Sequence, residues 1–140
     1  MKGHLKLISG KKIHSPKGLI TRPTTSIVRE ALMNIIGKKI SNSNWLDLCS
    51  GSGIISCEAI QKGAKRVLAI ESNKKIAQIC KINLLSTAEL LNKEIFIEII
   101  CSEMLRVLKQ GCQNKSFKFL EKYSQEDPRF DFVYIDPPYK

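Results

Sequence analysis

The segment Asp136-Pro137-Pro138-Tyr139 places an acid, two prolines and an aromatic ring directly after the apolar run 132–135. Prolines at a strand end stop regular pairing and fix a rigid turn. The acid, nearby carbonyls and the ring then project from the strand end, where open α/β sheets bind ligands. Such acceptors can orient a conjugated, weakly nucleophilic amine, and Tyr139 can stack on a base that has left its helix. A Pro-Pro turn alone is as often an ordinary strand end, so the upstream segments must decide.

A second segment, 47–53, has the sequence DLCSGSG and joins an apolar run to a helical pattern. Gly51 and Gly53, with Ser52 between them, allow a tight turn and close approach of a ligand to the backbone. Asp47 would repel a pyrophosphate but attracts a cation. S-adenosylmethionine carries an ammonium and a sulfonium group and no phosphate. Glu71, 18 residues after Gly53, is placed to accept hydrogen bonds from ribose hydroxyls. The bland alternative is a tight strand–helix turn followed by a capping acid.

Short apolar runs alternate with helical patterns from residue 44 onwards, and this alternation predicts a mostly parallel sheet with helices on both faces. The predicted strands cover 45–49, 66–70, 95–101 and 132–135. The predicted helices lie near 54–62, after Asn73 as a capping residue, and near 103–109. Residues 110–129 form a polar insert with no clear pattern.

The first 40 residues precede this alternation and differ from it in pattern. Residues 4–13 alternate loosely around Ser9-Gly10, which predicts a hairpin, and 15–23 predict a loop. A helix follows, with a cap among residues 24–26 and an end at Gly37. Its predicted apolar face consists of Ile27, Ala31, Leu32, Ile35 and Ile36.

Composition favours one domain of 140 residues, in which 1–40 is a basic hairpin and helix and 41–140 binds the cofactor. No apolar run suits a membrane span and no signal peptide is evident, so we expect a cytoplasmic protein, with an organelle left open. The five widely spaced cysteines are expected to be reduced and mostly buried, and no metal site is indicated.

The net charge of +10 is concentrated near the N-terminus. Residues 1–40 hold nine Lys or Arg and one acid, whereas the other hundred hold fourteen basic and twelve acidic residues. A basic segment suits a polyanion because it displaces counterions from phosphates. A lysine-rich, merely soluble surface is the alternative. The predicted RNA contacts are Lys11, Lys12, Lys17 and Arg22.

These segments together resemble the bacterial small-subunit ribosomal RNA guanine-N2 methyltransferases. Residues 18–25 (GLITRPTT) and 28–35 (VREALMNI) are similar to the start of that family, followed in order by its L-D-L-x-x-G-S-G and D-P-P-Y motifs. The resemblance implies a Rossmann-like class I fold and methyl transfer from S-adenosylmethionine to the exocyclic N2 amine of a guanine. It also implies ribosomal RNA or an assembling small subunit as partner, and a monomeric complete enzyme.

The sequence departs from this family in several places. Cys49-Ser50 stands where Phe-Ala is usual, and Ser102 stands where an Asp or Asn often contacts the adenine amine, so Ser102 is only a provisional cofactor residue. Such domains continue for three more strands, and we therefore expect an incomplete enzyme with negligible turnover alone. The alternatives are a non-catalytic RNA-binding fragment, an amino-group methyltransferase acting on DNA adenine or protein glutamine, and a nicotinamide dehydrogenase.

Overall fold

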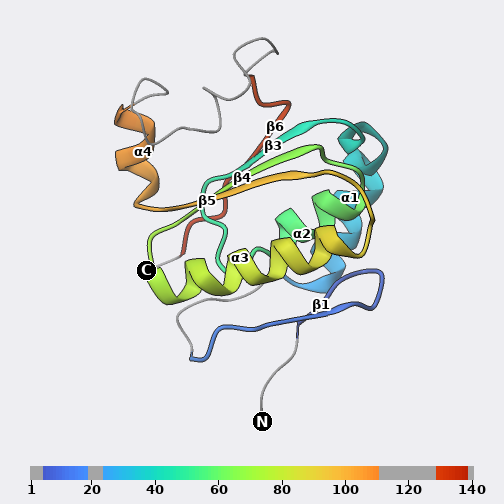
Figure 1. Cartoon of the computed structure of the whole chain (residues 1–140), viewed down its shortest axis with the longest axis horizontal. Coiled ribbons are helices and arrows are strands. Elements are labelled where there is room, and N and C mark those ends of the chain that lie inside the picture. The colour runs from blue at the N-terminus through green and yellow to red at the C-terminus, as the bar shows by residue number, and fades with distance from the viewer. Residues whose placement is uncertain (1–4, 19–23, 111–128, 139–140) are drawn as a thin grey trace.

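The computed structural model describes residues 5–18, 24–110 and 129–138. A four-stranded parallel sheet has the strand order β5-β4-β3-β6 (Figure 1). Its strands are β3 (Asn44–Asp47), β4 (Arg66–Glu71), β5 (Phe96–Cys101) and β6 (Phe132–Tyr134). β3 pairs with β4 on one side and with β6 on the other. The prediction of a parallel α/β sheet is confirmed, and all three of its helical connections begin beyond the carboxyl ends of strands.

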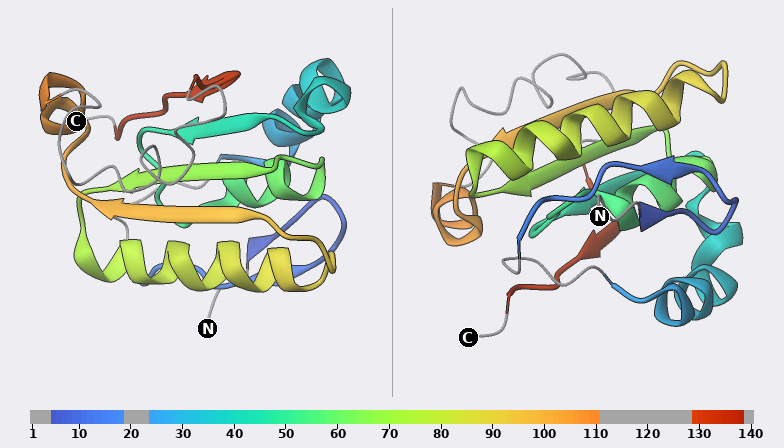
Figure 2. Two further views of the ribbon diagram at one scale, coloured as in Figure 1. Left: turned by 45° about the horizontal axis from the view of Figure 1, so that its top comes forward. Right: turned by 90° about the horizontal axis from the view of Figure 1, so that it is seen from below.

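Three helices share one face of the sheet: α1 (Ser26–Ile40), α2 (Ile54–Gln61) and α3 (Lys74–Glu89). They bury a common core with the inward side chains of the strands, centred on Trp45, Ile60 and Leu84. The opposite face is covered, among the described residues, by α4 (Met104–Gln110), whose Val107 packs with Leu68. Figure 2 shows α4 set beyond the end of β5 and α3 running along β5. None of the described helices is long and apolar enough to cross a membrane.

The predicted hairpin is present as β1 (Leu5–Lys6) and β2 (Lys12–Ile13), which pair antiparallel. It lies outside the helical layer, on the side away from the sheet (Figure 1). Leu7 and Ile13 enter the core, and Asn83 of α3 bonds both the N–H and the carbonyl of His14. The N-terminal segment is thus held on α2 and α3 by buried contacts.

The predicted apolar face of α1 was correct for Leu32 and Ile36, which pack against the core, and wrong for Ile27, Ala31 and Ile35, which are exposed. Ile27 and Ile35 are 78% and 77% exposed, whereas Arg29, Met33, Gly37 and Ile40 are buried. Gly37 does not end the helix, which continues to Ile40 and passes close to the side chain of Lys62 there. The cap is Thr25, whose hydroxyl accepts the N–H of Val28. The helix therefore points its charged Arg29 inward, where it pairs with Glu58 of α2.

Candidate active site at the carboxyl edge of the sheet

The segment 47–53 forms a turn between β3 and α2, as expected. Gly53 has φ +80°, and an added Cβ would lie 2.5 Å from Leu84 Cδ1 and 2.8 Å from Cys80 Sγ. Gly51 has φ +53°, but an added Cβ would meet nothing within 4 Å. Gly53 is therefore needed so that α3 can pack against the turn, whereas Gly51 faces open space that a ligand can enter. Ser52 lies between them, and its carbonyl accepts a hydrogen bond from Asn83.

Asp47 ends β3 and is 1% exposed. Its Oδ2 accepts a hydrogen bond from Ser56 Oγ at 2.8 Å, and its Oδ1 accepts the Cys49 N–H at 3.3 Å. Burial raises the pKa of Asp47 from 3.8 to about 7, an effect that the Ser56 bond opposes and that the charges of Glu71 and Asp136 increase. Asp47 thus braces the turn from within and adds negative potential to it. Sequence analysis assigned Ser56 no role, although its hydroxyl lies in the first turn of α2, directly after the glycine turn.

Glu71 ends β4 beside the same turn. Its Oε2 accepts the Gly51 N–H at 2.9 Å and its Oε1 accepts the Asn73 N–H at 3.0 Å. Asn73 caps α3 through its own side chain, as predicted. Ser102 follows β5, and its N–H donates to the Glu71 carbonyl, so this provisional residue lies at the same edge. The parallel register therefore brings the predicted cofactor residues of three strands together.

Asp136 lies just beyond β6 and joins this edge from the other side of β3. Its Oδ2 lies 3.5 Å from both Thr24 Oγ1 and Tyr134 Oη. Pro137 and Pro138 follow it as an exposed, non-helical segment, as expected. Tyr139, the proposed stacking residue, falls outside the described residues.

Three carboxylates from three adjacent strands thus share one edge of the sheet: Asp47, Glu71 and Asp136. Within the described segments none of the three forms an ion pair. The salt bridge found there joins two other residues, Arg29 and Glu58. Uncompensated carboxylates around an open glycine turn fit a cationic ligand and disfavour a phosphate. S-adenosylmethionine meets both conditions, so the residues present fit this cofactor.

The basic residues predicted to bind RNA are not equivalent. Lys12 and Lys17 are exposed, but the ammonium of Lys11 donates to Ser86 and Thr87 of α3 and holds the hairpin in place. Arg22 lies outside the described residues. Lys6, which the sequence did not single out, is exposed and pairs directly across the hairpin with Lys12. Like charges in opposed positions destabilise a hairpin unless an anion compensates them.

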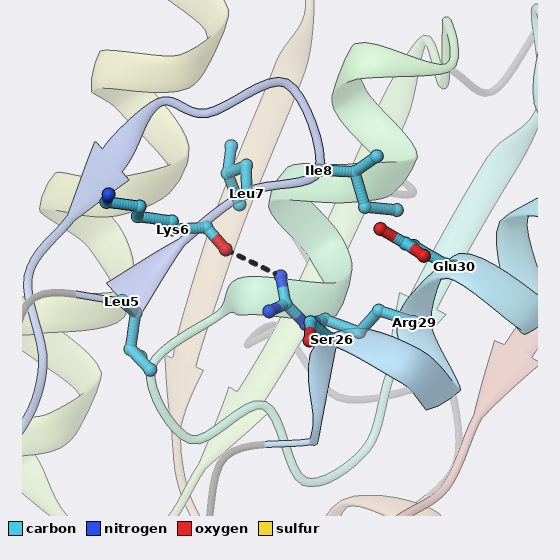
Figure 3. Close-up of a pocket in the computed structure, with 7 residues that line it drawn as sticks. All are labelled: Leu5, Lys6, Leu7, Ile8, Ser26, Arg29 and Glu30. Carbon is cyan, nitrogen blue, oxygen red and sulfur yellow. Dashed lines mark hydrogen bonds between the residues drawn. The ribbon is translucent and has the colours of Figure 1, made fainter.

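A cavity of about 380 Å³ lies between the hairpin and the start of α1 (Figure 3). Its lining consists of Leu5, Lys6, Leu7, Ile8, Ser26, Arg29 and Glu30. None of the predicted site residues belongs to this lining. We therefore place the site at the sheet edge and regard the cavity as a gap above the buried guanidinium of Arg29.

Comparison with known proteins gives the chain a family. The profile described as conserved hypothetical protein 95 matches residues 5–140. A ribosomal RNA small subunit methyltransferase D of Haemophilus influenzae is 32% identical over 142 residues, which is 99% of this chain and 65% of that protein. A putative rRNA methyltransferase of Bacillus subtilis is 29% identical over 140 residues, which is 97% of this chain and 67% of that protein. The chain thus spans about two thirds of the length of these curated relatives.

A solved structure supports the same grouping. The crystal structure of a putative methylase from Haemophilus influenzae superposes with a TM-score of 0.61 at 30% identity, covering 99% of this chain and 66% of that one. The Rossmann-like class I methyltransferase fold expected from the sequence is confirmed.

Proposed function

The chain belongs to the conserved hypothetical protein 95 family, and from this we propose that it is the catalytic part of a methyltransferase acting on small-subunit ribosomal RNA, with S-adenosylmethionine as cofactor. The observation that carries the proposal is the meeting of Asp47, Glu71 and Asp136 at one sheet edge beside the open turn at Gly51. The relatives named as ribosomal RNA methyltransferases supply the substrate class.

The finer proposal is that the accepting group is the exocyclic N2 amine of a guanine. Bound S-adenosylmethionine would supply an electrophilic methyl group and leave as the neutral thioether once the methyl is transferred. Asp136 accepts an N–H of the amine and so directs its lone pair. As the N–C bond forms, the C–S bond of the methyl donor would break, and the amine proton passes to solvent water. Glu71 is placed to accept the ribose hydroxyls, and Asp47 supports the turn and attracts the ammonium group from behind it.

RNA reaches this edge along the hairpin in our proposal. The cross-strand lysines Lys6 and Lys12, with Lys17 beyond them, offer exposed cations that form no ion pair with any residue the structure describes. An RNA backbone would relieve their mutual repulsion and gain from counterion release. A cytoplasmic location and an assembling small subunit as substrate remain predictions.

The deciding experiment is transfer of a labelled methyl group to small-subunit ribosomal RNA, naked and in particles lacking the modification, followed by nucleoside analysis. Label in N2-methylguanosine supports the full proposal, and label in another nucleoside overturns only the guanine assignment. Parallel assays with adenine-containing DNA and a glutamine peptide test the other amino-group acceptors. Binding of S-adenosylhomocysteine and RNA without turnover would favour the non-catalytic fragment.

A further inference from the structure

We propose that Thr24 is a positioning residue for Asp136, and that Tyr134 and the buried pair Arg29–Glu58 hold the two in register. This inference rests on the proposed function, because it concerns how the carboxylate that accepts the amine is held. Three oxygens form a small triangle at the site. Thr24 Oγ1 lies 3.4 Å from Tyr134 Oη, and each of these hydroxyls lies 3.5 Å from Asp136 Oδ2.

Both contacts fall on the same carboxylate oxygen. Among the described residues, Asp136 Oδ1 accepts no hydrogen bond, so it remains available to the substrate amine. Hydroxyl contacts of 3.4–3.5 Å are long for O–H···O hydrogen bonds. Contacts in catalytic sites commonly tighten only when substrate binds. The triangle is thus suited to fix the rotation of the carboxylate about its side chain at the moment when the amine arrives.

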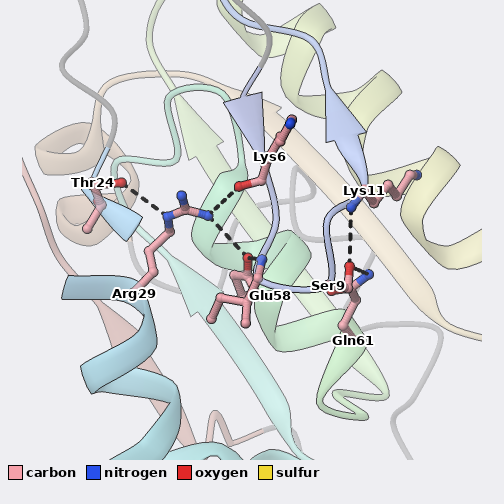
Figure 4. A network of polar contacts seen from close by, with 8 residues as sticks. Lys6, Ser9, Lys11, Thr24, Arg29, Glu58 and Gln61 are labelled. Atoms are coloured by element: carbon pink, nitrogen blue, oxygen red, sulfur yellow. Dashed lines mark hydrogen bonds and ion pairs between the residues drawn. The ribbon is translucent and has the colours of Figure 1, made fainter. Parts of the chain in front are cut away.

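Thr24 is itself held by a buried guanidinium. Arg29 Nε donates to the Thr24 carbonyl at 3.1 Å, and Arg29 Nη1 donates to the Lys6 carbonyl at 2.8 Å and lies 3.2 Å from Glu58 Oε1 (Figure 4). Glu58 also accepts the Ile8 N–H at 2.8 Å. The planar fork of Arg29 therefore ties the hairpin, α2 and the residue before the α1 cap into one rigid unit. The position of Thr24 is set by this unit, although Thr24 precedes the first turn of the helix.

Tyr134 is fixed from the other side of the triangle. Its ring stacks on Trp45 of β3, with ring centroids 6.4 Å apart and an angle of 20° between the planes. Trp45 is 1% exposed and lies in the core, so the Tyr134 hydroxyl projects from a rigid support. Thr24 and Tyr134 thus approach Asp136 from two separately anchored positions, the residue before the α1 cap and strand β6. Neither residue belongs to the D-P-P-Y motif or to the glycine turn.

The test compares Thr24→Val, which removes the hydroxyl, with Thr24→Ser, which keeps it. Thr25→Val is the matched control, because it removes the neighbouring cap and weakens α1 without touching the triangle. The first readout needs no turnover. The tyrosines are replaced by 3-fluorotyrosine, which titrates at lower pH, and the Tyr134 resonance is assigned with Tyr134→Phe and followed by fluorine NMR. Burial raises the pKa of Tyr134, the Thr24 hydroxyl lowers it, and the charge of Asp136 raises it.

We expect Thr24→Val to raise the Tyr134 pKa further, Asp136→Asn to lower it, and Thr24→Ser and Thr25→Val to leave it near its original value. The second readout is methyl transfer to small-subunit ribosomal RNA by the full chain. Thr24→Val should lower kcat by about tenfold to a hundredfold, as expected for a misplaced catalytic group, with the Kd for S-adenosylhomocysteine unchanged and activity recovered in Thr24→Ser.

The outcomes separate this inference from the function it rests on. If Thr24→Val leaves the pKa of Tyr134 unchanged, the inference is overturned whether or not the chain is active. If Thr24→Val changes the pKa of Tyr134 but not kcat, the positioning role is overturned, although the contact between Thr24 and Tyr134 is supported. A wild-type chain that methylates no RNA, while its titration responds to both variants, refutes the proposed activity of this chain and leaves the support of Asp136 by Thr24 standing.

Discussion

We expect Asp47 to couple cofactor binding to pH in the neutral range, because burial raises its pKa to about 7 in the free protein. A cation bound beside it favours the ionised form, so we expect the affinity for S-adenosylhomocysteine to rise by up to about eightfold between pH 6 and pH 7.5. Titration calorimetry in buffers of different ionisation enthalpy should also show a proton released on binding. Asp47→Asn should flatten the dependence, and equal affinity at both pH values in wild type would contradict this role.

The raised pKa of Asp47 has the opposite effect on stability: the free energy of unfolding should fall, not rise, as the pH increases. The folded state holds the Asp47 proton more tightly than the unfolded chain, whose carboxyl titrates near 3.8. The contribution of Asp47 to the free energy of unfolding should therefore fall as pH rises from about 4 to about 7. The free protein should be more stable at pH 5 than at pH 7.5 relative to Asp47→Asn, and cofactor should offset the difference.

Gly51 and Gly53 form a matched pair that separates ligand approach from packing. Gly51→Ala places its Cβ in open space and should weaken cofactor binding, while the backbone strain at φ +53° costs about 1–2 kcal/mol of stability. Gly53→Ala adds a collision with Leu84 and Cys80 to a similar strain. It should cost about 1–3 kcal/mol more. Chemical denaturation and calorimetry on both variants test this, and the pairing fails if Gly51→Ala binds cofactor as wild type does.

At the scale of elements, the Arg29–Glu58 pair decides how the N-terminal segment is attached. Both side chains are buried, with 6% and 2% of their surface exposed, and the pair joins α1 to α2 while Glu58 also binds the hairpin. Glu58→Ala leaves a buried, unpaired guanidinium and should cost about 3–5 kcal/mol of unfolding free energy. Glu30→Ala, which removes an exposed acid beside Arg29 on α1, should change the free energy of unfolding by no more than about 0.5 kcal/mol. Similar losses of unfolding free energy in the two variants would show that the Arg29–Glu58 pair does not stabilise the attachment of the N-terminal segment.

The elements also show what the sequence could and could not predict. The strands were predictable because each contains a short apolar run, and three of them end at or close to an acid, so the parallel alternation placed Asp47, Glu71 and Asp136 at one edge. The buried face of α1 was predicted only at Leu32 and Ile36, because its centre holds the charged Arg29, whose partner Glu58 lies 29 residues away. Apolar periodicity cannot predict a buried ion pair, so it indicated Ile27 and Ile35 as buried instead.

Thr24 and Tyr134 escaped sequence reasoning for a related reason. Thr24 was considered only as a cap, and Tyr134 was counted as strand. Their contact spans 110 positions and depends on the pairing of β3 with β6. Lys11 shows the reverse case, since its charge suggested RNA but its ammonium is engaged by α3. Composition locates a basic segment, but only the packing shows which of its cations are available.

For the whole molecule, these distinctions predict how RNA affinity is distributed over the hairpin. Replacing Lys6 and Lys12 by Gln should weaken RNA binding and reduce the salt slope by about 0.7–0.9 for each lost phosphate contact. It should also stabilise the hairpin slightly, because the two cations repel each other across the strands. Lys38→Gln with Lys39→Gln, two exposed cations at the far end of α1, is the control. An unchanged slope in the hairpin variant would place the RNA elsewhere.

Among the described strands, β6 forms one edge of the sheet and has β3 as its one neighbour. Val133 within β6 and Ile135 directly after it are 54% and 55% exposed. Unpaired backbone groups with apolar side chains recruit other strands, and a charged side chain there suppresses such pairing. We therefore expect the chain to self-associate with increasing concentration in sedimentation velocity. Val133→Lys with Ile135→Lys should shift it towards monomer.

Ile82→Lys is the control for this experiment, because Ile82 is similarly exposed, at 52%, but lies on α3. A general gain in solubility from an added charge would appear in the control as well, whereas an effect of the β6 edge would not. If the wild type sediments as a monomer at every concentration, or if Ile82→Lys acts as strongly as the β6 variant, then the β6 edge does not govern assembly.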